Sequence, residues 1–138
     1  MKAIVLNIAF LFMLNIVGFT QEVNSCYTEI SCKDFHLMME TKNPMIIDVR
    51  LYKDYRKERI YDSHIATEKT ALKELLKNVR KETDILVYCS KGERSRVAAE
   101  IICKEMKFKN VYSLEKGINE WKRKGYQTES SELKSSEY

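Results

Sequence analysis

Several features that mark large classes of proteins are missing from this sequence. No block of five like charges occurs in its 138 residues, so a nucleic-acid-binding arm is not indicated, although the formal net charge is +4. There is no internal repeat, and the length suffices for one domain rather than two. There is also no C-x-x-C pair and no His/Cys cluster at zinc-finger spacing. We therefore expect neither a metal nor a cofactor, and no nucleic acid among the partners.

The first twenty residues are almost free of charge. Lys2 is their only charged residue, and an apolar run over 3–19 ends among small residues. This is the layout of a secretory signal peptide cleaved before Gln21. We expect residues 1–20 to be removed and the protein to be exported, periplasmic or extracellular, without membrane contact. Two alternatives stay open: a retained membrane anchor, since the run is nearly long enough to span a bilayer, and a lipoprotein with lipid on Cys26.

Four cysteines follow the leader: Cys26, Cys32, Cys89 and Cys103. An exported protein meets an oxidising compartment, in which paired cysteines are expected. An extended segment between Cys26 and Cys32 would hold their Cα atoms about 18–20 Å apart, at about 3.3 Å per residue. A disulfide needs about 4.4–6.8 Å, so we expect no bridge between these two. The sequence assigns no other pairing and no oligomeric state.

Strands and helices alternate between the leader and a polar tail, residues 128–138, that we expect to be disordered. Apolar runs predict strands over 27–30, 45–49, 85–88 and 110–114. Helical periodicity predicts helices between Ser31, the expected N-cap, and Pro44 and over 70–81, 95–107 and 117–124, with the helix over 95–107 mostly buried. The highly charged stretch over 52–59 predicts a helical turn. The strand over 85–88 lacks alternation, which is typical of a central parallel strand. We therefore predict one α/β domain over 21–127, with a central, mainly parallel sheet flanked by helices.

The most informative stretch links the strand over 85–88 to the helix over 95–107. It reads Cys89-Ser90-Lys91-Gly92-Glu93-Arg94-Ser95. Sites in open α/β sheets lie at the carboxyl ends of strands, and this loop is short enough to turn several N–H groups toward its centre. The next helix adds the positive end of its dipole, and Lys91 and Arg94 add two cations. Such surroundings should lower the pKa of a thiol, whose thiolate is the reactive form. The alternative is that Cys89 merely ends a buried strand as a small apolar residue.

The loop resembles the active-site loop of single-domain rhodaneses, C-x-x-G-x-R-S. Three weaker motifs follow in the family's order: Asp48-Val49-Arg50 resembles D-V-R, Ser63-His64-Ile65 resembles G-H-I, and Gly117 with Trp121 resembles G-x-x-x-W. The resemblance covers roughly residues 27–127 and implies the rhodanese-like three-layer fold. The family's glycine before histidine is a serine at position 63, a departure that concerns the local strand and not the cysteine loop.

The resemblance implies a sulfurtransferase that works through a persulfide. Cys89 would take a sulfane sulfur from a small anionic donor such as thiosulfate, and a thiol or cyanide-like acceptor would remove it. The substrate-binding loop would consist of Ser90, Lys91, Gly92, Glu93, Arg94 and Ser95, and Ser95 would also cap the next helix. Asp48 and Arg50 would give structural support.

Other functions remain in competition with this hypothesis. A phosphatase or arsenate reductase of the same fold would have a loop one residue longer, C-x-x-x-x-x-R, whereas Arg94 gives C-x-x-x-x-R here. A non-catalytic rhodanese-like binding module would often lack the cysteine. A thiol–disulfide role for Cys32 has no resolving partner at suitable spacing.

Overall fold

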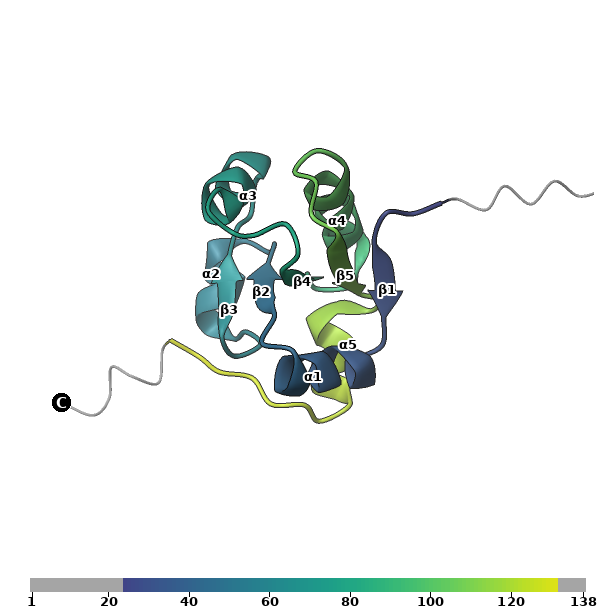
Figure 1. Ribbon diagram of the computed structural model, residues 1–138. Coiled ribbons are helices and arrows are strands. Elements are labelled where there is room, and N and C mark those ends of the chain that lie inside the picture. Colours follow the sequence, from purple (N-terminus) through teal and green to yellow (C-terminus); the bar gives the residue numbers. More distant parts are fainter. Residues whose placement is uncertain (1–23, 132–138) are drawn as a thin grey trace, which may run out of the picture.

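A single sheet lies between two layers of helices in the computed structural model (Figure 1), which describes residues 24–131. The five strands are all parallel, in the order β1-β5-β4-β2-β3. They span Thr28–Ile30 (β1), Met45–Asp48 (β2), Ser63–Ile65 (β3), Asp84–Tyr88 (β4) and Asn110–Leu114 (β5). The helices span Cys32–Thr41 (α1), Tyr52–Lys57 (α2), Lys69–Leu76 (α3), Glu93–Lys104 (α4) and Gly117–Arg123 (α5). The predicted leader lies outside the described residues.

Strand β4 occupies the centre of the sheet, as its apolar sequence predicts. Ile85 and Val87 join the core cluster that also holds residues of α3 and α4. Leu86 and Tyr88 point to the other side and join the cluster that holds residues of α1 and α5. Because successive side chains of a strand face opposite sides, one uninterrupted apolar run serves both layers. The predicted fold, a parallel sheet with helices on both faces, is confirmed.

The helices differ from the predicted ones mainly at their ends. Helix α1 begins as predicted, because Ser31 Oγ accepts a hydrogen bond from the backbone N–H of Asp34 at 3.2 Å. Helix α3 ends earlier than expected, at Leu76, where Val79 N donates to Leu76 O in a turn. The prediction that the helix over 95–107 is mostly buried is wrong. Helix α4 covers the sheet with one face only, and Val97 on the other face is 61% exposed.

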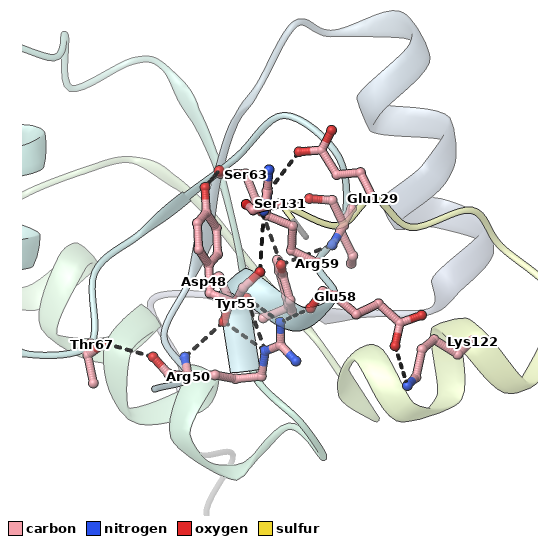
Figure 2. Close-up of polar contacts among 12 residues, drawn as sticks. Asp48, Arg50, Tyr55, Glu58, Arg59, Ser63, Thr67, Lys122, Glu129 and Ser131 are labelled. Carbon is pink, nitrogen blue, oxygen red and sulfur yellow. Dashed lines mark hydrogen bonds and ion pairs between the residues drawn. The ribbon is translucent and has the colours of Figure 1, made fainter. Parts of the chain in front are cut away.

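The beginning of the tail is held in place, although its composition predicts disorder from residue 128. Glu129 pairs with Arg59 through both backbone groups, at 2.9 and 2.8 Å. The Arg59 side chain also donates to Glu129 Oε1 at 2.8 Å and to Ser131 Oγ at 2.6 Å (Figure 2). Polar composition alone does not reveal such partners, because the same side chains would be equally soluble without them. Residues 132–138 lie outside the described part.

One disulfide joins Cys26 to Cys103, 77 residues apart, with Cα atoms separated by 5.9 Å. It ties the chain before the edge strand β1 to the end of α4. Cys32 and Cys89 are free, so the prediction that Cys26 does not pair with Cys32 is confirmed. Closing a loop of this length restricts the unfolded chain by about 4–5 kcal/mol in the chain-entropy account. Between residues 24 and 131, no helix is long and apolar enough to cross a membrane.

Candidate active site

Cys89 follows the last residue of the central strand, and the chain then curls around its sulfur. The Cys89 side chain is buried, with 2% of the residue exposed. The backbone N–H of Gly92 points to Sγ at 3.1 Å and that of Ser95 at 3.4 Å. The hydroxyl oxygen of Ser95 lies 3.6 Å from the same sulfur. The loop therefore surrounds one sulfur atom with hydrogen-bond donors.

These donors decide the pKa of the thiol. Burial is the largest single influence and raises the pKa of Cys89, but the hydrogen bond with the Ser95 hydroxyl and those from the N–H groups of Ser95, Gly92 and Lys91 outweigh it. The net pKa is lowered, as the sequence predicts. The cause differs in part from the expected one, because hydrogen bonds rather than the Lys91 and Arg94 charges supply the main lowering influences. The hydrogen bonds of the loop therefore favour the thiolate form of Cys89 more than its burial alone would.

Two glycines allow the loop to take this shape. Gly92 has φ +104°, and a Cβ there would lie 2.0 Å from the carbonyl oxygen of Glu115. Gly117 has φ +64°, and a Cβ there would lie 2.4 Å from the carbonyl oxygen of Ser90. Both distances are far below van der Waals contact, and left-handed φ is costly for other residues. The G-x-x-x-W motif therefore belongs to the site, because its glycine lets the α5 turn approach the loop.

The start of α5 also satisfies carbonyl groups of the loop. Ile118 N donates to Cys89 O at 2.9 Å, and Asn119 N donates to Ser90 O at 3.1 Å. The first N–H groups of a helix have no partner within the helix. Here they bind the outward-facing carbonyls, so that the N–H groups of the loop remain turned toward the sulfur.

Helix α4 starts earlier than predicted. Gly92 is its N-cap and Glu93 its first residue, so the expectation that Ser95 caps the helix is wrong. Because Gly92 adopts a left-handed backbone conformation, the helix begins at Glu93, two residues before the predicted start at Ser95. Ser95 is fully buried in the first turn, and its hydroxyl donates to Gly92 O at 3.0 Å.

The charged residues of the loop face solvent. Lys91, Glu93 and Arg94 are exposed, and within residues 24–131 the Lys91 and Arg94 side chains have no hydrogen-bond or ion-pair partner. Ser90 is half-buried, with its carbonyl bound by Asn119. The structure therefore directs the N–H groups of Gly92 and Ser95 to the sulfur and leaves the two cations at the surface, while Ser90 contacts α5 instead.

Asp48 and Arg50 lie at the carboxyl end of β2, the neighbour of β4 (Figure 2). Both are buried, and the Arg50 guanidinium donates to the two Asp48 carboxylate oxygens at 2.7–3.0 Å. Arg50 Nη2 also donates to Glu58 O at 2.6 Å, and Thr67 Oγ1 donates to Arg50 O at 2.7 Å. A buried ion pair is costly unless further hydrogen bonds complete it. These contacts do so, and they join β2 to α2 and to the segment before α3.

The sequence analysis missed Ser113, which lies on β5. It is fully buried, and its hydroxyl donates to Ser95 Oγ at 2.9 Å. The only signal in the sequence is a serine inside an otherwise largely apolar strand. His64, to which we assign no role, is exposed on β3.

Comparison with known proteins agrees with this geometry. The family model described as "Rhodanese-like domain" matches residues 31–124. The thiosulfate sulfurtransferase GlpE of Coxiella burnetii is 34% identical over 97 residues, which cover 70% of this chain and 88% of GlpE. The tRNA uridine(34) hydroxylase of Buchnera aphidicola is 33% identical over 106 residues, but the match takes in only 33% of that protein and 72% of this chain.

Among solved structures, the rhodanese-like domain of the Anabaena sp. protein Alr3790 has the same fold. It superposes with a TM-score of 0.67 at 22% identity, covering 80% of this chain and 83% of that domain. The family match extends over most of the described residues and includes the whole cysteine loop. The chain therefore belongs to the rhodanese-like domain family.

Proposed function

We propose that this protein is a sulfurtransferase that carries sulfur as a persulfide on Cys89, with thiosulfate as a donor. The observation that carries the proposal is the buried position of Cys89 Sγ, which accepts hydrogen bonds from two backbone N–H groups of the loop at 3.1 and 3.4 Å. Membership of the rhodanese-like family and the similarity to a thiosulfate sulfurtransferase support it.

The first half-reaction loads the cysteine. The Cys89 thiolate attacks the outer sulfur of thiosulfate, forming a new S–S bond while the bond to the central sulfur breaks and sulfite leaves with the electron pair. The product is a persulfide whose terminal sulfur bears the negative charge. The inward-facing N–H groups of Gly92 and Ser95 would stabilise that charge without reorganising.

The second half-reaction regenerates the thiolate. A thiolate or cyanide-like acceptor attacks the outer sulfur of the persulfide, and the Cys89 sulfur leaves with the electron pair. The donors that lower the pKa of Cys89 also stabilise it as this leaving group. One set of hydrogen bonds therefore serves both halves of the cycle.

Cys32, the other free cysteine among the described residues, shows how the loop changes the pKa of a buried thiol. It is as buried as Cys89, with 3% of the residue exposed, and it is the first residue of helix α1. Burial raises the pKa of Cys32, and no converging set of loop N–H groups offsets it. Cys32 is therefore the internal control for burial without the loop.

The two free cations favour an anionic donor. Lys91 and Arg94 are exposed and unpaired within the described residues, so both can attract thiosulfate to the loop. Glu93 lies between them in the sequence and offsets part of their charge. We therefore expect a donor affinity that weakens with salt.

Export of the mature protein is the second part of the proposal. The leader-like residues 1–20 motivate it, and the disulfide between Cys26 and Cys103 supports it, because disulfides persist in oxidising compartments. A cysteine whose sulfur is in a disulfide cannot also carry a thioether-linked lipid, so the disulfide argues against the lipoprotein alternative.

Sulfur loading tests the central claim. Incubation with thiosulfate should add the mass of one sulfur atom to the intact protein, and peptide mapping should place it on Cys89. Cys89→Ser should abolish the addition because a hydroxyl cannot form a persulfide, whereas Cys32→Ser should load like the wild type. Loading that persists in Cys89→Ser would refute the assignment. Hydrolysis of an aryl phosphate without sulfur loading would favour the phosphatase, and neither reaction would favour the binding module.

The thiolate itself can be titrated. The ultraviolet absorbance difference between the wild type and Cys89→Ser should rise with pH around a midpoint lower than that of a free cysteine peptide, because the pKa of Cys89 is lowered. The same difference taken for Cys32→Ser should have a higher midpoint, because burial raises that pKa. Equal midpoints for the two cysteines would contradict the role given to the loop.

Steady-state kinetics test the role of Lys91. At low ionic strength, Lys91→Ala should raise the thiosulfate KM by about three- to tenfold and change kcat less, since the charge attracts both bound donor and transition state. Lys33→Ala removes an exposed lysine on α1 and serves as the control. An unchanged thiosulfate KM for Lys91→Ala would show that this lysine has no part in donor binding.

N-terminal sequencing and non-reducing peptide mapping of the naturally produced protein test export. The mature chain should begin near Gln21 and contain the peptide pair linked by Cys26 and Cys103. Met1 retained in a membrane fraction would show an anchor instead. Lipid on Cys26 would show a lipoprotein.

A further inference from the structure

Ser113 is an unusual residue for its position. It lies on β5 in register with Val87 of the central strand, and it is fully buried. Val87 and Val111, its neighbours on the same face, belong to the apolar core. A hydroxyl in such surroundings is costly unless it finds a hydrogen-bond partner.

The partner of Ser113 is the serine that approaches the sulfur. Ser113 Oγ donates to Ser95 Oγ at 2.9 Å, and within residues 24–131 its side chain has no other polar partner. Ser95 Oγ in turn lies 3.0 Å from Gly92 O and 3.6 Å from Cys89 Sγ. The two hydroxyls therefore form a buried chain that ends at the reacting atom.

The directions of these hydrogen bonds show how the two hydroxyls can act on the sulfur. With a neutral thiol, Cys89 Sγ donates to Ser95 Oγ while the Ser95 hydroxyl donates its own proton to Gly92 O. When the thiol loses its proton to a buffer base, the sulfur becomes an acceptor, and the Ser95 hydroxyl can rotate its proton from Gly92 O to Sγ. Ser113 donates to Ser95 in both states, so its own proton never competes for the sulfur.

We propose that Ser113 is a positioning residue, which holds the Ser95 hydroxyl so that its proton is available to the Cys89 sulfur. A hydroxyl that accepts a hydrogen bond donates more strongly, so the Ser113 contact strengthens the bond from Ser95 to the anionic sulfur. It also fixes the Ser95 rotamer through a rigid strand rather than through the loop. The inference rests on the proposed role of Cys89 as the reacting group.

A matched pair of variants isolates the hydroxyl from the side-chain shape. Ser113→Thr and Ser113→Val have the same shape and suit a strand, but only threonine can donate to Ser95. Ser113→Val should move the thiolate titration midpoint upward and slow sulfur loading by thiosulfate about two- to fivefold. Ser113→Thr should stay close to the wild type, and Ser113→Ala, with no added bulk, should behave like Ser113→Val. Equal midpoints for threonine and valine would overturn the proposal.

A double-mutant cycle tests whether Ser113 acts through Ser95. In a Ser95→Ala background, adding Ser113→Ala should leave the titration midpoint unchanged, because the link to the sulfur is already gone. A further upward shift in the double variant would show that Ser113 acts by another route and would overturn the proposal. Ser63→Ala removes another buried serine hydroxyl, one without contact to Ser95, and should not move the midpoint.

These readouts separate the inference from the proposed function. The titration midpoint reports the Cys89 thiolate whether or not sulfur is transferred. A midpoint that follows the hydroxyl at position 113 in a protein that never loads sulfur would support the positioning role and refute the sulfurtransferase. Normal sulfur loading together with a titration midpoint that does not change with the residue at position 113 would refute the positioning role alone.

Discussion

The close approach of the cysteine loop to the turn between β5 and α5 is the constraint on which the site depends. Gly92 sits against the backbone of Glu115, and Gly117 sits against the backbone of Ser90, each with no room for a Cβ. This contact lets the first N–H groups of α5 bind the loop carbonyls. Once the carbonyls face α5, the remaining N–H groups of the short loop face inward. The surroundings of the Cys89 sulfur are therefore set by backbone packing between segments more than twenty residues apart.

A site made of peptide dipoles behaves differently from one made of charges. The donors around Cys89 Sγ are fixed, buried and neutral, so they offset the burial penalty at the sulfur and are little affected by salt. Lys91 and Arg94 stand outside in solvent, where charges are strongly screened. In the proposed reaction the two sets of groups would have separate tasks: the backbone would stabilise the sulfur anion, and the side-chain cations would attract an anionic donor. A substitution in one set need not change the other.

The parts of this arrangement that are local in sequence could be predicted, and the parts that join distant segments could not. The apolar run of β4, the capping serine of α1 and the Cys89 loop are each encoded within a few neighbouring residues. The Ser113–Ser95 contact spans 18 residues, the disulfide 77 and the Arg59–Glu129 pairing 70. Nothing in the spacing of those residues indicates which partners meet, since register and helix docking decide it. In the sequence, Ser113 is only a polar residue within a largely apolar strand, and its role becomes visible only from its contact with Ser95.

Ser63, which stands where the resembled family has glycine, is accommodated by Tyr88, the residue before Cys89. Its hydroxyl donates to Ile60 O at 2.6 Å and lies 3.1 Å from the Tyr88 hydroxyl, which accepts the backbone N–H of Ile60 at 3.1 Å. Strand β3 forms in regular register with β2 despite the change. Burial, followed by the nearby Asp48 charge, raises the pKa of Tyr88, so its hydroxyl keeps its proton for this cycle. The Tyr88 ring packs on the α1 and α5 side of the sheet, whereas Cys89 packs on the α3 and α4 side. The contacts of the Ser63 hydroxyl with Ile60 and Tyr88 therefore lie on the opposite side of the sheet from the Cys89 sulfur.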